Sequence, residues 1–568
     1  MSALRPPGLG PIVGHTTESS CRLWIQANNP MDLARSAAAD RRTVGVIGLL
    51  SGERKILKAY YFRLQREFDR TGIFTLGEDV ALGRHESDGV APAEIDKPYK
   101  LRPDSEYVVR MATLSVDDPR PDDDSPSDAE IAKRLPDIEN IQDMLLGKEL
   151  DDYEVTFRTF PDKDSIQDKV SFLLGSCRYP GLLWKIKEAD RIFGPMLSHF
   201  DSGPDAARFT LMIGDQVYAD TLNRLLPVGR ADTYEEFQER YQTAFGSPNM
   251  RRLLRTSPTY MMLDDHEIED NWTQDQLRDA GKHRLFNYAI GAYMSYEWSH
   301  SPRTWGRLLY YKFDCGGYPF FVLDTRTQRF KDDAEGLEDN HMLGRPQIDR
   351  QHLGQLQQLL NWLSDQQKLR GNVPKFIGSS SVFAPNAMDE RLSGEGVPNL
   401  FRGNEKRRGD SDSWPAYPRT RQAILQHIVD NHIENVVFLT GDIHCANIAR
   451  MEIEVNAKQP AARSLGLHLY DITSSAFYWP FPFADGDPNN YVHDSRAPGQ
   501  FDVFPLNDGE MHYTSWAYTQ EDNFCRIYVD RPTSALTVQY FDRNGKLLGV
   551  TGKDEGYTDT NVLPLARW

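Results

Sequence analysis

The second part of this chain alternates apolar runs with helical stretches, and this alternation constrains its fold more than any other feature. Six runs of buried-strand character lie at residues 170–175, 209–213, 259–263, 319–323, 375–378 and 436–440. Helical spacing between them predicts helices over 184–200, 233–245, 346–368 and 419–433. Near-continuous apolar strands with intervening helices predict an α/β fold, built on a mainly parallel sheet that helices cover on both faces.

The first part of the chain carries no comparable helical pattern. Short runs rich in β-branched and aromatic residues lie at 20–27, 43–50, 55–63, 107–114 and 153–160. They predict a small β-sandwich domain over residues 1–162, followed by an α/β domain over 163–568. The length of 568 residues also favours two or more domains.

The charge of the chain excludes some classes of partner. The formal net charge of −18 argues against broad attraction to nucleic acid or to an anionic membrane. No apolar run approaches the length of a membrane-spanning helix. The first residues contain neither an apolar stretch nor twin arginines, which predicts a cytoplasmic protein as written, or an exported one if a leader has been removed. The five cysteines form no CxxC pair and indicate no disulfide framework.

Every predicted strand of the second part runs into polar residues that could bind an ion. These residues are Cys177, Asp215, Asp264, Asp265, His266, Glu267, Asp324, Arg326, Ser379, Ser380, Asp442 and His444. Any one of them alone is equally well explained as a turn residue. The carboxyl ends of strands in an open α/β sheet gather on one side, however, where clustered carboxylates raise one another's pKa unless a cation is present. The pattern therefore predicts a site for two or three metal ions.

The donor types suggest which ions bind. Asp215 and Tyr218 combine a carboxylate that could bridge two ions with a phenolate, a pair suited to ferric iron, and Cys177 would add a thiolate. His266 and His444 would add imidazoles. The further oxygen ligands, suited to calcium, magnesium or manganese, are Asp264, Asp265, Asn271 and Asp442. Imidazole and carboxylate ligands on adjacent metals are a usual means of activating water against a phosphoryl group. The strings GxSxG, GxxxxGK[ST] and GxGxxG do not occur at these positions, which argues against a serine nucleophile or a nucleotide cradle.

Seven motifs, in this order, resemble those of the PhoD-like, alkaline phosphatase D family. They are GSC (175–177), GDQVY (214–218), DDHEIEDN (264–271), DTR (324–326), SWPAYPRTR (413–421), GDIH (441–444) and TSS (473–475). The resemblance implies a metallophosphatase α/β/β/α sandwich, in which two mixed sheets are flanked by helices, preceded by an immunoglobulin-like β-sandwich domain. It also implies Fe³⁺ and Ca²⁺ as cofactors, with other divalent ions as alternatives.

The resemblance further implies roles for single residues. Cys177, Asp215 and Tyr218 would hold iron, with Asp215 bridging to a second metal. Asp264, Asn271, Asp442 and His444 would complete the metal shells. His266 would bind the phosphoryl group or protonate the leaving oxygen, while Arg326 and Arg178 would contact the phosphate. Trp184, Trp414 and Tyr417 are expected to wall the pocket.

The favoured hypothesis is a phosphoric-ester hydrolase, either phosphatase or phosphodiesterase, in which a metal-activated hydroxide attacks phosphorus in line. Monoester and diester substrates both stay open. The alternatives are a catalytically silent phosphate- or metal-binding protein on the same fold, and a different metal-assisted hydrolase. The sequence gives no indication of oligomeric state.

Overall fold

The computed structural model covers the whole chain and describes most of it. The described residues are 4–27, 41–82, 97–117, 126–181, 186–201, 203, 205–220, 229–331, 341–344, 352–386, 413–455, 463–481, 491–496, 504–552 and 556–568. The chain divides into two compact units. Unit 1 comprises Met1–Ser165, Tyr234–Tyr260 and Gly291–Pro302, and unit 2 comprises Ile166–Thr233, Met261–Ile290 and Arg303–Trp568. The domain boundary at 162/163 stays a prediction. The pattern of apolar residues gave no sign that Tyr234–Tyr260 and Gly291–Pro302 belong to unit 1.

Unit 1 contains two antiparallel sheets that share a hydrophobic core. One sheet has the order β1 (Leu9–Thr16), β2 (Cys21–Gln26), β5 (Thr71–Leu76), and the other has the order β4 (Ile56–Arg63), β3 (Arg41–Leu50), β6 (Glu106–Asp117), β7 (Glu154–Arg158). Leu23 and Phe74 from the first sheet lie in one buried cluster with Ile47 and Val109 from the second. The immunoglobulin-like character of this part stays a prediction.

Helices complete unit 1. They are α1 (Asp128–Ala132), α4 (Tyr234–Phe245), α5 (Pro248–Thr256) and the end of α6 (Ala280–Tyr296). The indole Nε1 of Trp24 on β2 donates to the Ser295 carbonyl of α6 at 2.9 Å, which ties this helix to the first sheet. The sequence analysis predicted α4 but neither α5 nor α6.

Unit 2 contains two mixed sheets and a short hairpin. The six-stranded sheet has the order β10 (Thr259–Met262), β9 (Ala207–Ile213), β8 (Lys169–Gly175), β20 (Asn523–Asp530), β21 (Ala535–Asp542), β24 (Asn561–Pro564). The larger sheet has the order β11 (Tyr311–Cys315), β12 (Tyr318–Val322), β13 (Lys375–Ser379), β14 (Val436–Thr440), β17 (Leu469–Thr473), β15 (Ala446–Val455), β19 (Gly509–Thr519), β18 (Phe504–Pro505), and β16 (Arg463–Ser464) pairs with β15. β22 (Val550–Thr551) and β23 (Tyr557–Thr558) form the hairpin. Strands β12, β13, β14 and β17 run parallel, whereas β20 runs antiparallel to β8.

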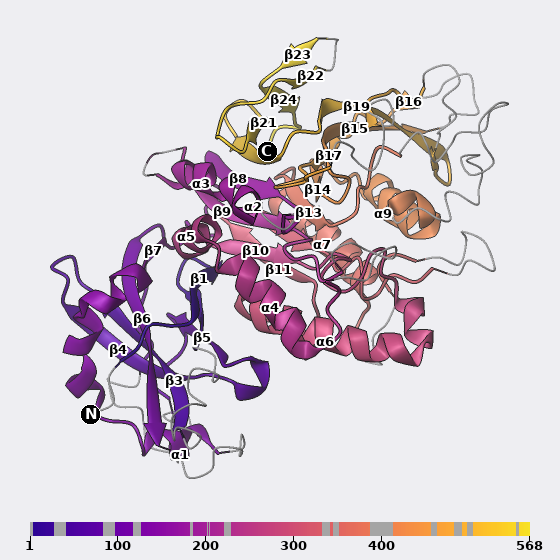
Figure 1. Ribbon diagram of the computed structural model, residues 1–568. Helices are drawn as coiled ribbons and strands as arrows, with labels where there is room; N and C mark the ends of the chain where they lie inside the picture. Colours follow the sequence, from indigo (N-terminus) through magenta and orange to yellow (C-terminus); the bar gives the residue numbers. More distant parts are fainter. Residues whose placement is uncertain are drawn as a thin grey trace. The chain divides into compact units, whose positions relative to one another are not determined.

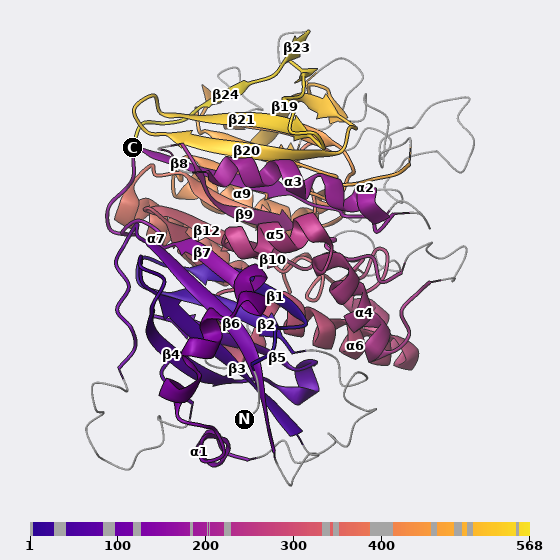
Figure 2. The same ribbon diagram turned by 60° about the vertical axis from the view of Figure 1, so that its left-hand side comes forward.

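The two sheets of unit 2 form the inner layers of a four-layer arrangement (Figures 1 and 2). Phe172 of β8 packs edge-on against Phe320 of β12 and Phe376 of β13, with ring centroids 5.4 Å apart in both pairs. Helices α7 (Gln355–Arg370) and α9 (Pro418–Asp430) pack on the outer face of the larger sheet, in one cluster with its strands. Helices α2 (Ile186–Arg191) and α3 (Phe193–Met196), with the turn Leu197–Phe200, cover the other sheet, where His199 contacts Phe524 and Phe541.

The mixed α/β expectation is confirmed, whereas the single, mainly parallel sheet is wrong. Strands buried on both faces have the same continuous apolar pattern in either sheet, so periodicity could not divide them between two sheets. The predicted helix over 184–200 is two short helices and a turn in the described residues, interrupted around Pro195, which lacks a backbone donor. The predicted helix over 346–368 begins only at Gln355, after Gly354, and residues 345–351 lie outside the described part.

Within the described residues, no helix is both long enough and apolar enough to cross a membrane. All five cysteines are described, and each is a buried thiol outside any disulfide.

Candidate metal centre

Four strand ends of unit 2 come together at one place. The turns after β9, β10 and β14 carry Asp215, Asp264, Asp265 and Asp442, and one carboxylate oxygen of each lies within 4.8 Å of the corresponding oxygens of the others. Cys177, two residues after β8, reaches the same place. These segments are far apart in the chain and belong to both sheets of unit 2, so it is the packing of the two sheets that gathers the side chains. Three of the carboxylates are buried and Asp442 is partly exposed.

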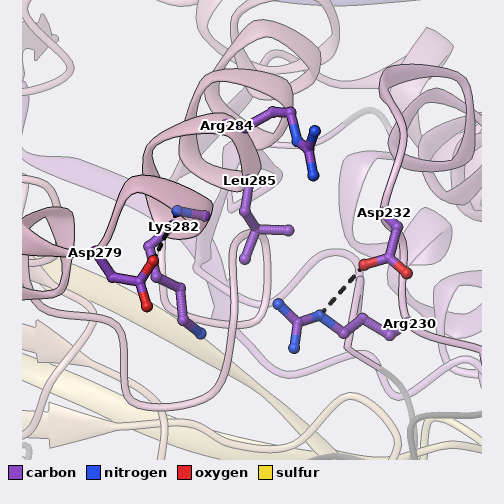
Figure 3. A pocket seen from close by; sticks show the side chains of 7 residues that line it. Arg230, Asp232, Asp279, Lys282, Arg284 and Leu285 are labelled. Carbon is purple, nitrogen blue, oxygen red and sulfur yellow. Dashed lines mark hydrogen bonds and ion pairs between the residues drawn. The ribbon is translucent and has the colours of Figure 1, made fainter.

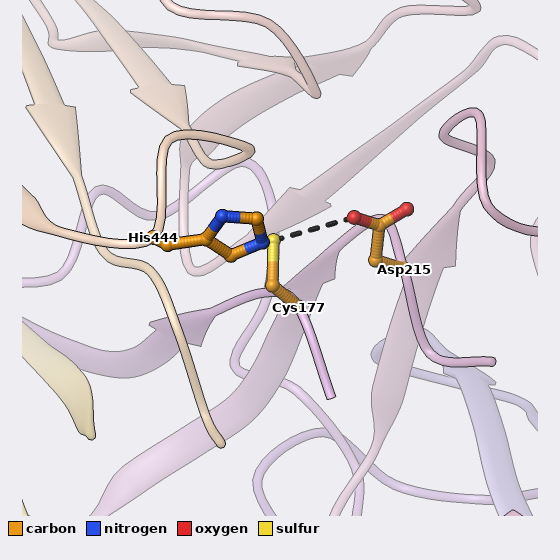
Figure 4. A group of neighbouring side chains, drawn as sticks. All are labelled: Cys177, Asp215 and His444. Atoms are coloured by element: carbon orange, nitrogen blue, oxygen red, sulfur yellow. Dashed lines mark hydrogen bonds between the residues drawn. The ribbon is translucent and has the colours of Figure 1, made fainter. Parts of the chain in front are cut away.

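Cys177 and His444 lie on one side of Asp215 (Figure 4). The Sγ atom of Cys177 lies 3.4 Å from Asp215 Oδ2, and donor atoms of all three residues lie within 4.8 Å of one another. The hydroxyl of Tyr218 is 3.3 Å from both Asp215 Oδ2 and His444 Nε2. A thiol, a carboxylate, a phenol and an imidazole therefore meet at one point. This donor set fits a ferric or other transition-metal ion.

His266 lies on the opposite flank of the tyrosine. Its ring stacks on Tyr218 with centroids 4.2 Å apart, and its Nδ1 is 2.8 Å from Asp220 Oδ1. A ligand atom of His266 also lies within 4.8 Å of Asp215 and Asp265. The Asp220 contact orients the imidazole, so that Nε2 is the nitrogen left for chemistry.

Arg326 is fully buried among the carboxylates. Its Nε donates to Asp264, and its Nη2 lies 3.3 Å from Asp265 Oδ1 and 3.6 Å from Asp442 Oδ2. The hydroxyl of Ser380 donates to Asp264 Oδ1 at 2.6 Å. Arg326 thus offsets part of the negative charge of the group, and its role as a phosphate contact stays a prediction.

Arg178 and Asn271 occupy less central positions. The backbone N–H of Arg178 donates to the Asp215 carbonyl at 2.8 Å, while its guanidinium lies over the ring of Phe193. Burial lowers the pKa of Arg178 to about 10, and nearby Asp190 opposes this shift. Asn271 is exposed, and its side-chain amide donates to Asp270 Oδ1 at 3.2 Å. Their predicted roles in phosphate and metal binding stay predictions.

The predicted aromatic walls are wrong for two of the three residues. Trp414 and Tyr417 are fully buried in the core beneath α7 and α9, where the Trp414 indole donates to Ser379 Oγ. Trp184 lies outside the described residues. The aromatic side chain that does stand at the centre is Trp479, whose ring stacks on His444 at a centroid distance of 3.6 Å. It follows the motif TSS by four residues, which is too weak a signal to identify it from sequence.

Glu267 organises the turns that carry the candidate ligands, a role that its place among the polar strand-end residues did not reveal from sequence. Its carboxylate is fully buried and accepts backbone N–H groups from Asp215 (3.2 Å), Gln216 (2.6 Å), Val217 (3.4 Å) and Asp264 (2.8 Å). One side chain therefore holds the turn after β9 against the turn after β10. Asp220, the partner of His266, was likewise missed.

The backbone at the candidate ligands is unusual. Cys177, Asp215, Asn271, Asp442 and His444 all have positive φ angles, between 52° and 76°. Side-chain-bearing residues adopt this region rarely, and such conformations persist where the surrounding structure imposes them, often at functional sites.

The electrostatics of the centre also indicate a place for cations. Burial raises the pKa of the Asp215 carboxyl well above its usual value, and Asp264 and Asp265 raise it further while His266 lowers it. Burial also raises the pKa of Cys177, with the charges of Asp215 and Asp442 acting in the same direction. Bound cations would favour the ionised form of these groups and relieve their repulsion, so the residues present fit a site for metal ions.

The comparisons with known proteins agree with this geometry. The sequence model of the PhoD-like phosphatase family matches residues 192–477, about half of the chain. Alkaline phosphatase D of Bacillus subtilis (strain 168) is 23% identical over 233 residues, which cover 39% of this chain and 37% of that relative.

One solved structure extends the similarity to the fold. A structure of PhoD superposes with a TM-score of 0.61 at 15% identity, covering 98% of this chain and 92% of that one. A purple acid phosphatase from yellow lupin (Lupinus luteus) seeds gives a TM-score of 0.47 at 11% identity, with 99% of this chain and 74% of that one covered. From the extent of the family match, the chain belongs to the PhoD-like phosphatase family.

Proposed function

We propose that this protein is a metal-dependent phosphoric-ester hydrolase whose ions bind around Asp215. The observation that carries the proposal is that Asp215 belongs to all three of the groups, found among the described residues, whose side chains could hold an ion. A carboxylate shared in this way is what a bridging ligand between two adjacent metals requires. Membership of the PhoD-like phosphatase family supports the same reaction class.

The donor sets on the two sides of Asp215 suggest different ions. Cys177, Tyr218 and His444 supply a thiolate, a phenolate and an imidazole on one side of Asp215, and we assign this side to Fe³⁺. Asp264, Asp265 and Asp442 form a carboxylate side, which we assign to Ca²⁺, with Asn271 as a further oxygen ligand. When bound, such ions activate water and neutralise charge on phosphoryl oxygens.

The remaining residues act on the substrate. His266, oriented by Asp220, would protonate the leaving oxygen through Nε2. Arg326 and Arg178 would stabilise charge on the phosphoryl group. Monoesters and diesters are both candidate substrates. We further propose that the first domain, over residues 1–162, has an immunoglobulin-like fold.

The test combines metal analysis with turnover. Purified protein should contain iron and calcium and should hydrolyse a chromogenic phosphate monoester or its matching diester. Iron bound by Tyr218 predicts a visible tyrosinate charge-transfer band, which Tyr218→Phe should remove. Tyr179→Phe is the matched control because Tyr179 packs on Tyr218, with ring centroids 5.2 Å apart, from outside the donor set. Full turnover by protein stripped of both metals would refute the proposal.

A further inference from the structure

A pocket of about 420 Å³ lies between the residues that follow Gly229 and the start of α6 (Figure 3). Three cations line it, namely Arg230, Lys282 and Arg284, together with Asp232, Asp279 and the buried side chain of Leu285. Figure 3 shows the two guanidinium groups on either side of Leu285. All of these residues belong to unit 2.

The carboxylates around this pocket already have partners. Glu269 lies between two of the cations, because Arg230 Nη1 is 2.9 Å from its Oε1 and Lys282 pairs with its Oε2. Asp279 precedes α6, and its Oδ1 accepts the Gly281 N–H at 2.7 Å. Asp232 lies 3.7 Å from Arg230 Nε. Arg284, in contrast, is exposed and makes no ion pair with any residue that the structure describes.

The pocket is joined to the candidate metal centre by two short connections. Glu269 lies three residues after His266, and its backbone N–H donates to the Asp265 carbonyl at 2.7 Å. On the other wall, Ala231 follows Arg230 and donates to the Ala219 carbonyl at 2.7 Å, while Ala219 donates to the His266 carbonyl at 2.9 Å. The two walls of the pocket are therefore tied by backbone hydrogen bonds to the segment around His266, the residue expected to protonate the leaving group.

We propose that this pocket binds a second anionic group, a phosphate or a carboxylate, carried by the leaving alcohol of the substrate, with Arg284 as its main contact. The inference rests on the proposed function. A guanidinium presents a planar fork of donors that matches either anion in two-point fashion. In a chain of net charge −18, three cations around one pocket supply the local positive charge that an anion needs, and among the residues that the structure describes Arg284 pairs with no carboxylate. Leu285 offers an apolar surface to the carbon chain that links the two anionic groups.

The test uses a series of straight-chain alkyl phosphates of increasing length that end in a methyl, a carboxylate or a phosphonate group. For chains long enough to reach the pocket, kcat/KM for an anionic end should exceed that for the methyl end by about tenfold, the effect of one charge-assisted contact. The measured quantity is the ratio of kcat/KM for the anionic end to kcat/KM for the methyl end. A general structural defect lowers both values and leaves this ratio unchanged. Comparison of the carboxylate and phosphonate series identifies which anion the pocket prefers.

Variants locate the effect. Arg284→Gln should bring the ratio close to one, and Arg284→Lys should retain part of it because the charge persists without the fork. Arg252→Gln removes the same charge from an exposed position on α5 and should leave the ratio unchanged. Equal rates for all chain ends, or an anion preference that survives in Arg284→Gln, would overturn the pocket's role alone. Failure to hydrolyse even the methyl-ended esters would overturn the proposed function and, with it, this role.

Discussion

His266 and Asp220 form a pair at the edge of the candidate centre, with Nδ1 and Oδ1 2.8 Å apart. The other oxygen of Asp220 accepts the Asp270 N–H at 2.6 Å, so the carboxylate fixes both the imidazole and the backbone beside it. This arrangement resembles the way many catalytic histidines are oriented by an acidic partner.

Replacing Asp220 by Asn should reveal whether His266 protonates the leaving oxygen. An amide has one acceptor oxygen, so the variant loses one of the two contacts and the imidazole is less well oriented. We expect kcat to fall by about 10²-fold for an alkyl phosphate, whose leaving group needs a proton. For 4-nitrophenyl phosphate, whose leaving group departs as a stable anion, the fall should be much smaller. Equal losses for the two esters would contradict the assignment.

Replacing Glu267 by Gln should weaken metal binding without direct removal of a ligand. The amide group cannot accept all four backbone N–H groups that the carboxylate accepts. Each buried donor left without a partner lowers the free energy of unfolding by about 1–3 kcal/mol. We expect a lower thermal midpoint together with reduced iron and calcium content, measured by calorimetry and elemental analysis. Glu188→Gln on α2 is a suitable control, because Glu188 forms only partly exposed ion pairs. A variant with full metal content would show that the two turns hold their positions without Glu267.

His300 should make the protein sensitive to acid. Its ring is fully buried in unit 1, and burial, with Arg22 acting in the same direction, lowers its pKa to about 3. Because the folded-state pKa lies below the unfolded value of 6.5, the neutral ring stabilises the fold fully above pH 6.5, and this contribution is lost as the pH falls toward 3. The free energy of unfolding of His300→Leu should be compared with that of the unsubstituted protein at each pH. As the pH is lowered from 7 to 5, this difference should shift by about 2 kcal/mol in favour of the variant. Urea unfolding at the two pH values measures this difference, and a constant difference would contradict it.

Phe172 should be the most sensitive position between the two sheets of unit 2. It is fully buried and packs on Phe209, Phe320 and Phe376. Phe172→Ala should reduce the free energy of unfolding by about 3–5 kcal/mol, whereas Phe172→Leu should cost clearly less because more of the volume is retained. Similar losses in the two variants would argue against tight packing at this point.

The sequence predicted best where one local pattern decides the outcome. Strand β14 was placed at its observed residues, 436–440, because a strand buried on both faces is apolar throughout. The meeting of Cys177 and Asp215 could be expected because the carboxyl ends of the neighbouring parallel strands β8 and β9 lie together. Asp442 follows β14 of the other sheet, and its approach depends on how the two sheets of unit 2 pack. Their use as ligands is still a hypothesis.

Features that depend on tertiary packing were beyond the sequence. Glu267 looked like one more acidic residue, since its four backbone partners come from two turns about fifty residues apart. Trp414 and Tyr417 suggested pocket walls, because burial of an aromatic side chain depends on what the neighbouring helices cover. The pocket around Arg284 arises from two segments whose charges show no pattern in sequence.

Asp215 belongs to all three groups that could hold an ion in the described part of the chain, and this sharing has a thermodynamic consequence for the proposed centre. If one carboxylate serves both ions, then occupancy of the first alters the affinity for the second, and by reciprocity the second alters the first to the same degree. Loading and release of the two metals are then linked events. A shortage of either metal would then inactivate the whole centre rather than one half of it.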